Sequence, residues 1–261
     1  MPGMIPKQLS QFFSKQTFRK VPEVILLFWI IKLLTTAMGE STSDFLVRTI
    51  DPVIAVAIGA VGFGIAIILQ FAVRKYIAWI YWLTVTMVAI FGTMAADVIH
   101  IGLGVPYLYS TIFFLIALAA IFTIWYASEK TLSIHSITSR RREIFYWATV
   151  LTTFALGTAA GDMTASTFGL GYLNSGILFA VLFLIPAVAW KFFKLNAIVT
   201  FWFAYIMTRP FGASFADWFG RTSGLGGIGF GTGKTSIVLG ILIIIFVMYL
   251  TITKVDVKDK H

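Results

Sequence analysis

The sequence WIIKLLTTAMGESTSD, residues 29–44, contains a frame that is repeated along the whole chain. It begins with Trp29, has Gly39 ten residues after the Trp and ends with Asp44 fifteen residues after it. A repeat at a fixed spacing is typical of an architecture built from copies of one unit. The sequence therefore predicts four structural repeats. The other three copies of the frame are Trp82–Gly92–Asp97, Trp147–Gly157–Asp162 and Trp202–Gly212–Asp217.

The frame fits one face of an α-helix. At about 100° per residue, side chains spaced three or four residues apart form a single stripe. In the first repeat this stripe consists of Lys32, Thr36, Glu40 and Asp44. The Gly of each frame and a small residue four positions later form the small-xxx-small pattern that lets membrane helices approach closely. We therefore expect the charged face to point to protein or water rather than lipid. The expected packing residues are Gly39, Gly92, Gly157 and Gly212.

The composition is that of a membrane protein. Of the 261 residues, 59% are hydrophobic and 12% are charged, whereas about 25% are charged in soluble domains. The chain has no Cys, which excludes disulfides and thiolate metal ligands. The net charge of +9 suggests nucleic acid at first sight, but the basic residues lie in short segments between apolar runs. We therefore expect a lipid bilayer, and no nucleic acid, as the partner.

Eight apolar segments are long enough to cross about 30 Å of hydrocarbon. The predicted fold is an all-α polytopic membrane protein with eight transmembrane helices from four parallel two-helix repeats. The flanking segments are an amphipathic N-terminal helix over 1–20, a basic loop over 128–142 between the halves 21–127 and 143–254, and a tail over 255–261. The eight spans are expected near 22–46, 53–73, 76–99, 106–127, 143–166, 173–191, 197–219 and 235–253.

The distribution of Lys and Arg predicts the orientation in the membrane. Fifteen of the 20 basic residues lie on the side of the chain termini, and three lie on the opposite side. Positive charge favours the cytoplasmic side. Both termini are therefore expected in the cytoplasm. The remaining two basic residues, Lys32 and Arg209, are expected inside the membrane.

The first frame and its setting, KVPEVILLFWIIKLLTTAMGESTSD over residues 20–44, resemble a family of bacterial inner-membrane proteins. Members of that family have four tandem repeats, each with two membrane helices and a characteristic Trp, and the resemblance covers about residues 21–253. It implies a bacterial inner-membrane location. The repeat of that family has no known function, so the resemblance implies no substrate.

The charged face predicts an ion site. Glu40 and the four Asp of the frames outnumber Lys32 and Arg209, so a bound cation or protons should supply the remaining positive charge. Carboxylates and hydroxyls are ligands for hard divalent ions, and clustered carboxylates also hold protons. The expected acidic ring, a candidate metal site, is Asp44, Asp97, Asp162 and Asp217, extended inward by Glu40, Thr93 and Thr158. The expected counter-charges are Lys32 and Arg209, and the aromatics expected to narrow the pathway are Trp29, Trp82, Trp147 and Trp202.

Three functions agree with this pattern. The first is a transporter of a small cation, with a divalent metal as the leading candidate and coupling to protons as an option. The second is a membrane scaffold or accessory subunit in which the Asp residues cap helix ends and the Trp residues anchor at the lipid interface. The third is a carrier of small organic ions that uses cation–π contacts. No nucleophile–base motif appears in the sequence, so an enzyme is not expected.

Two further motifs do not predict a site. The run GGIGFGTGKT, residues 226–235, resembles a phosphate-binding loop, but that motif requires Gly at position 228, which is Ile228. His100, His135 and His261 are far apart in the sequence, so a zinc site built from histidines is not expected.

Overall fold

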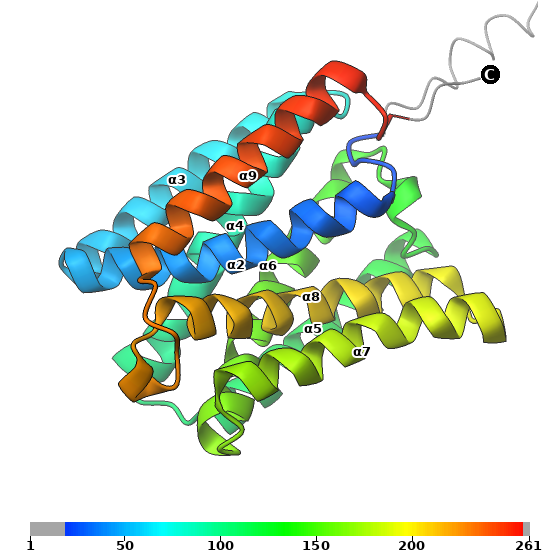
Figure 1. Ribbon diagram of the computed structural model, residues 1–261. Helices are drawn as coiled ribbons and strands as arrows, with labels where there is room; N and C mark the ends of the chain where they lie inside the picture. The colour runs from blue at the N-terminus through cyan, green and yellow to red at the C-terminus, as the bar shows by residue number, and fades with distance from the viewer. Residues whose placement is uncertain (1–18, 258–261) are drawn as a thin grey trace, which may run out of the picture.

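The computed structural model describes residues 19–257, in which all regular structure is helical (Figure 1). The all-α prediction is confirmed. Each predicted apolar segment overlaps a long helix, whose ends lie within a few residues of the expected ones. The long helices are α2 (Leu26–Thr49), α3 (Pro52–Ala72), α4 (Ala78–Asp97), α5 (Tyr107–Glu129), α6 (Arg140–Asp162), α7 (Gly171–Phe193), α8 (Ala197–Gly220) and α9 (Thr232–Thr253).

Six helical segments of the described chain are long and apolar enough to cross a membrane. They are the segments that contain α3, α4, α5, α6, α7 and α9. The other two helices, α2 and α8, carry the buried Lys32, Glu40 and Arg209. A multi-pass membrane protein is therefore the class that this structure supports. Most of the predicted amphipathic segment 1–20 lies outside the described residues.

The four helices that carry the frame form a closed ring. Contacts run from α2 to α4, from α4 to α6, from α6 to α8 and from α8 back to α2. The remaining four helices lie outside this ring. In Figure 1, α9 runs along α2 and α7 runs along α8, each on the outside of its partner. The bundle therefore consists of an inner ring, made of α2, α4, α6 and α8, and an outer layer, made of α3, α5, α7 and α9.

Each outer helix packs chiefly against the inner helix of the next repeat. Helix α3 packs on α4, α5 on α6, α7 on α8, and α9 returns to α2, which closes the circle. The two layers also differ in exposure. Only 17% of the apolar stretch of α3, α5 and α7 is buried, against 56% in the α4 segment and 67% in the α6 segment. The apolar surface of the outer layer is thus available to lipid, and the polar residues of the inner ring are shielded from it.

The glycines of the frame lie where neighbouring inner helices approach each other. A Cβ added at Gly39 would lie 2.5 Å from Cβ of Ala89, and one added at Gly92 would lie 2.8 Å from Cβ of Phe154. A Cβ at Gly157 would meet Arg209. Each Gly thus faces the residue seven positions after the Trp of the next repeat. The fourth contact, from Gly212 to Thr36, closes the ring in the same way.

The segment between the two predicted halves is short and well anchored. It contains a turn of 3₁₀ helix, η2 (Ile134–Ser136), and the side chain of Ser139 caps the start of α6. Buried Glu143 forms an ion pair with Lys20 and accepts a hydrogen bond from Gln70 Nε2 at 3.1 Å. The division of the chain into two halves stays a prediction, since the inner ring is continuous through all four repeats.

Candidate functional site

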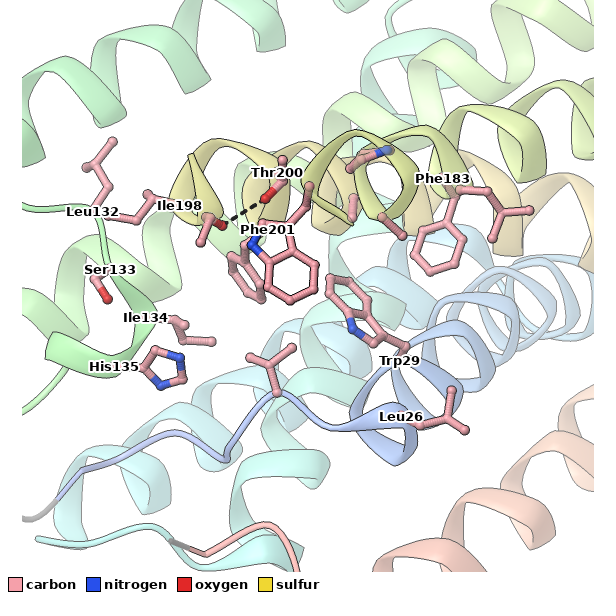
Figure 2. Close-up of a pocket in the computed structure, with 17 residues that line it drawn as sticks. Leu26, Trp29, Leu132, Ser133, Ile134, His135, Phe183, Ile198, Thr200 and Phe201 are labelled. Carbon is pink, nitrogen blue, oxygen red and sulfur yellow. Dashed lines mark hydrogen bonds between the residues drawn. The ribbon is translucent and has the colours of Figure 1, made fainter. Parts of the chain in front are cut away.

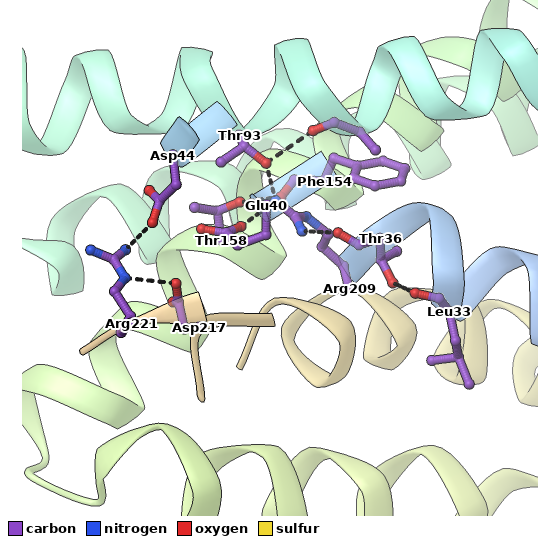
Figure 3. Close-up of polar contacts among 11 residues, drawn as sticks. Leu33, Thr36, Glu40, Asp44, Thr93, Phe154, Thr158, Arg209, Asp217 and Arg221 are labelled. Carbon is purple, nitrogen blue, oxygen red and sulfur yellow. Dashed lines mark hydrogen bonds and ion pairs between the residues drawn. The ribbon is translucent and has the colours of Figure 1, made fainter. Parts of the chain in front are cut away.

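The four Asp residues of the frames lie at one end of the inner ring, which we call the Asp end. The opposite end, where the four Trp residues lie, is the Trp end. The structure divides the Asp residues into two pairs. Asp44 and Asp217, from repeats 1 and 4, are buried and share Arg221 (Figure 3). Arg221 Nη2 lies 2.9 Å from Asp44 Oδ2, and Arg221 Nε donates to Asp217 Oδ1 at 2.8 Å.

The loop after α8 holds Arg221 in place. Arg221 lies four residues after Asp217, and its backbone carbonyl accepts a hydrogen bond at 2.8 Å from the N–H of Gly229, in the Gly-rich loop. Burial alone would lower the pKa of the guanidinium, but the carboxylates of Asp217 and Asp44 raise it above its ordinary value. Arg221 is therefore a permanent cation that the first pair of carboxylates shares.

The second pair, Asp97 and Asp162 from repeats 2 and 3, has a different partner. Within residues 19–257, no hydrogen bond or ion pair reaches either carboxylate. One ligand atom from each of Asp97, His100 and Asp162 lies within 4.8 Å of the other two. His100 is buried, and Ser110 Oγ lies 2.6 Å from its Nε2. These three side chains form the cluster of the described residues that is able to hold a metal ion.

Both members of the second pair precede a π-helical turn. Helix α4 continues as η1 (Val98–Gly102), and α6 continues as η3 (Met163–Thr167). Such turns are rare and occur frequently at functional sites. Repeats 1 and 4 have no such turn, because α2 ends at Thr49 and α8 ends at Gly220. The four repeats therefore differ just where the Asp residues lie.

Arg209 occupies the centre of the inner ring. Its Nη2 donates to Glu40 Oε2 at 2.8 Å and to Thr158 Oγ1 at 2.7 Å, and it also bonds the hydroxyl of Thr93. Figure 3 shows the guanidinium among these three side chains, each of which lies eleven positions after the Trp of its repeat. Arg209 Nη1 donates to the carbonyl of Thr36 at 3.0 Å. One Arg from repeat 4 is thus bonded to all three other repeats.

Lys32 is the second buried cation, and it lies among aromatic rings. Its Nζ is 3.9 Å from the ring centroid of Phe154 and 4.3 Å from that of Tyr205. No hydrogen-bond partner reaches this Nζ among the described residues. The ring of Phe154 also lies 5.2 Å from the guanidinium carbon of Arg209. Both cations thus lie near the ring of Phe154, and within the described residues Lys32 is not paired with Glu40.

Aromatic side chains fill the Trp end. Trp82, Trp147 and Trp202 are buried, while Trp29 is half-buried. The residue before each Trp is also aromatic and completes the cluster. The hydroxyls of Tyr81 and Tyr146 are hydrogen-bonded to each other. The cluster closes the inner ring at this end. The four preceding residues are Phe28, Tyr81, Tyr146 and Phe201.

An apolar cavity of about 580 Å³ lies beside the Trp end (Figure 2). It is bounded by the start of α2, the end of α7, the start of α8 and the segment that contains η2. Trp29, Phe183 and Phe201 line it, and His135 lies at its edge. The cavity is separate from the charged residues of the inner ring, so it does not belong to the polar site.

The structure brings most of the predicted site residues together on one axis, but it adds two that the sequence analysis missed. The axis carries the Asp residues, Glu40, Thr93, Thr158 and Arg209. Arg221 and His100 were missed, although both have a spacing signal. Arg221 stands four residues after an Asp, as Arg48 does in repeat 1, and His100 stands three residues after Asp97. The expectation of no histidine-based zinc site missed this cluster, because Asp97 stands three residues before His100 and Asp162 comes from another repeat.

Comparison with known proteins identifies a repeat family. The family described as Repeat of Unknown Function (DUF347) matches four consecutive stretches that together cover most of the chain, and each stretch contains one complete frame. No curated protein and no solved structure matches this chain. The predicted resemblance to a family with four tandem repeats is confirmed. The matched stretches are residues 27–76, 80–131, 145–196 and 200–256.

Proposed function

The chain belongs to the DUF347 repeat family, and from its buried polar axis we propose that it is a transporter of a small cation, a divalent metal ion being the leading candidate, and not an enzyme. The observation that carries the proposal is the row of charged residues inside a bundle whose outer layer is apolar. Ionisable groups within a membrane are costly, by roughly 2.5–3.5 kcal/mol each, and they mark ion pathways. Five acidic residues lie along this axis.

In this proposal all eight helices span a bacterial inner membrane, with both termini in the cytoplasm. The apolar segments support six of the spans directly. Helices α2 and α8 supply the remaining two, because their charged residues face the inner ring rather than lipid. The excess of basic residues beside the termini supports this orientation. The Asp end then faces the outside of the cell and the Trp end faces the cytoplasm.

The central pair of Glu40 and Arg209 is suited to a gate. A cation that reaches the Asp end is attracted by the carboxylates but meets the positive charge of Arg209. It can advance only if Glu40 exchanges Arg209 for the cation. The hydroxyls of Thr93 and Thr158, now bonded to Arg209, are also ligands for a cation. The aromatic cluster holds the Trp end closed in this conformation. Protons carried by the carboxylates provide a means of coupling.

Uptake into proteoliposomes tests the proposal. Purified protein is reconstituted, and the entry of Zn²⁺, Co²⁺, Mn²⁺ or Mg²⁺ is followed with a trapped metal-sensitive dye, with and without a pH gradient. We expect uptake of at least one of these ions by the natural protein. Glu40→Gln should lower the rate at least tenfold, because the amide cannot exchange Arg209 for a cation. The matched control is Asp51→Asn, which removes an exposed carboxylate at the same end but keeps an N-cap residue for α3.

One observation favours a second function, a membrane scaffold or accessory subunit. The guanidinium of Arg209 is buried and bonded to three repeats, so it ties the ring together. A scaffold needs the contacts of Arg209 that hold the repeats together, but it does not need a path for ions. Uptake that is absent for all four ions, with or without a pH gradient, would rule out the transport of these ions and favour the scaffold. Uptake that is unchanged in Glu40→Gln would show that the path avoids the axis.

A further inference from the structure

We propose that Asp97, His100 and Asp162 bind a divalent transition-metal ion, of the class of Zn²⁺ and Co²⁺, at the Asp end of the ring. This proposal deepens the proposed function by naming the substrate class, and it rests on that function only for the claim that the bound ion is transported. The three residues come from repeats 2 and 3, and one ligand atom of each lies within 4.8 Å of the others. Small rotations of the carboxylates bring all three onto one ion.

The imidazole of His100 has one nitrogen free for a ligand. The side chain is buried, with 7% of its surface exposed. Its Nε2 is 2.6 Å from Ser110 Oγ, whereas its Nδ1 is buried without a hydrogen-bond partner. An unpaired ring nitrogen in a buried position is costly. A metal ion at the lone pair of Nδ1 removes this cost.

The hydrogen bonds around Ser110 are compatible with the tautomer of His100 that binds a metal through Nδ1. The hydroxyl of Ser110 donates its single proton to the carbonyl of Tyr107 at 3.0 Å. Ser110 Oγ is then an acceptor for His100, and we adopt this arrangement, in which Nε2 carries the proton. Neutral imidazole then has its lone pair on Nδ1. This is the arrangement of a metal-binding His, whose other nitrogen donates to a fixed acceptor that orients the ring. The ring of Tyr107, 4.6 Å away, packs edge-on against the imidazole.

Charge and ligand type identify the class of ion. Two carboxylates balance the charge of a divalent cation, and neither is paired with Arg or Lys within the described residues. Mg²⁺ and Ca²⁺ prefer ligand sets made of oxygen alone, whereas imidazole favours Zn²⁺ and its neighbours in the first transition row. Three protein ligands leave at least one coordination position open, as in metal sites where the fourth ligand exchanges. An open position suits an ion that must arrive and leave.

The other Asp pair at this end cannot provide the same site. Arg221 is bonded to both Asp44 and Asp217, and Arg48 lies 3.6 Å from Asp44, so fixed cations already occupy the positions beside these carboxylates. The predicted metal site of four Asp residues is thereby reduced to one pair, and His100 is the ligand that gives this pair its preference among metals.

Cobalt spectroscopy tests this site without any measurement of transport. The protein is purified with a tag that contains no histidine, freed of metal with a chelator and titrated with Co²⁺, and the ligand-field absorption is recorded. Zn²⁺, Mg²⁺ and Ca²⁺ are then added in competition. We expect Co²⁺ bands that Zn²⁺ abolishes and that a large excess of Mg²⁺ or Ca²⁺ leaves in place. The variants are His100→Ala, Ser110→Ala and Asp162→Asn, with His135→Ala at the Trp end as the matched control.

Ser110→Ala should weaken Co²⁺ binding about 10–100-fold, as expected for the loss of a group that orients a ligand. His100→Ala and Asp162→Asn should weaken it more, and His135→Ala should leave it unchanged. Circular dichroism verifies folding. If His100→Ala does not fold, Ser110→Ala and Asp162→Asn decide the result. No Co²⁺ bands in the natural protein, or bands unchanged in these variants, would overturn the site. If the protein binds Co²⁺ but takes up no metal ion, the site is upheld and the transport proposal is rejected. If it takes up a metal ion but shows no Co²⁺ bands, the transport proposal is upheld and the site is rejected.

Discussion

Repeats 1 and 4 share their packing with repeats 2 and 3 but differ from them in charge. In all four, the Gly of the frame faces the next inner helix at the same position. At the Asp end the two sets differ. Asp44 and Asp217 share a guanidinium, whereas Asp97 and Asp162 lie near the imidazole of His100 without a bond to it. The packing positions of the frame therefore determine the ring, and residues just outside the frame determine the chemistry at its end.

The difference has a physical cause in the residues after each Asp. An Arg four residues later lies on the same face of a helix as the Asp and can pair with it. Arg48 and Arg221 have this spacing in repeats 1 and 4. Ile101 and Ser166 occupy the equivalent positions of the other repeats, where π-helical turns follow. The first pair therefore has fixed cations beside it and the second pair has none within the described residues, which is the basis of our proposal that the second pair binds a ligand.

The largest expected change in the free energy of unfolding comes from removing the cation beside the first pair, Asp44 and Asp217. Arg221→Gln leaves Asp44 and Asp217 buried without their shared cation. Breaking a buried ion pair in this way costs about 3–5 kcal/mol, and because 17% of the Arg221 side chain is exposed we expect about 3 kcal/mol. The measurement is unfolding in mixed detergent micelles. Arg48→Gln is the control, since Arg48 is about half exposed and 3.6 Å from Asp44, so its loss should cost less than about 1 kcal/mol. Equal losses would mean that Arg221 has no special role.

The second pair should respond to metal where the first does not. A ligand that binds only the folded protein stabilises it by about 2.7 kcal/mol at one hundred times its dissociation constant. We expect Zn²⁺ to produce such a gain in the natural protein and in Asp44→Asn, but not in Asp97→Asn. Thermal unfolding with and without Zn²⁺ measures the gain. If Asp44→Asn abolishes it as well, the four carboxylates act as one site and the division into pairs is wrong.

The positions of the helices could be predicted from the sequence, whereas the contacts between the helices could be predicted only in part. The frame and the apolar segments predict the eight helices, because periodicity and length are local properties. The preference of α3 for α4 over α2 could not be predicted, because an apolar helix such as VIAVAIGAVGFG, residues 53–64, has no feature that selects a partner. That choice depends on the shape of the whole ring.

For the site, the residues were predictable and their pairing was not. The stripe predicted Glu40, Thr93 and Thr158 at one depth, because they hold equivalent positions in parallel repeats, and it predicted Arg209 as a deeper counter-charge. The division of the Asp residues was not evident, because it depends on how the backbone continues after each frame. Arg221, at the end of α8, reaches both Asp217 in its own helix and Asp44 in α2, whereas His100 lies within the π-helical turn that follows Asp97.

A smaller loss of stability, from Gly→Ala variants, tests whether the inner helices pack in the same way in repeats 1 and 4 as in repeats 2 and 3. Gly39→Ala in repeat 1 and Gly92→Ala in repeat 2 both force a methyl group against the next inner helix. Overpacking costs about 1–3 kcal/mol, so we expect about 2 kcal/mol for each, equal within about 0.5 kcal/mol. Gly64→Ala in α3 is the control, since a Cβ there meets nothing within 4 Å and Ala favours the helix. Unfolding in mixed micelles measures all three. If the two Gly→Ala variants lose different amounts of unfolding free energy, the repeats are equivalent in backbone position but not in side-chain packing.

The smallest expected effect comes from converting the second pair into a copy of the first. His100→Lys places a fixed cation beside Asp97 and Asp162. Hydrogen bonds that involve charged groups contribute about 1.5–3 kcal/mol, but the substitution also removes the bond to Ser110 and the packing on Tyr107. We therefore expect a net gain of about 1 kcal/mol in the absence of metal.

The same variant should lose its response to Zn²⁺, because an ammonium group repels the ion and has no lone pair to offer it. The combination of greater stability without metal and no gain with metal distinguishes His100→Lys from His100→Ala, which loses the ligand and adds no charge. Thermal unfolding of both variants, each with and without Zn²⁺, measures this difference. If His100→Lys is less stable than His100→Ala without metal, the second pair does not need a cation. Its carboxylates would then be held neutral by protons, and the chemical difference between the two pairs would be one of protonation rather than of metal binding.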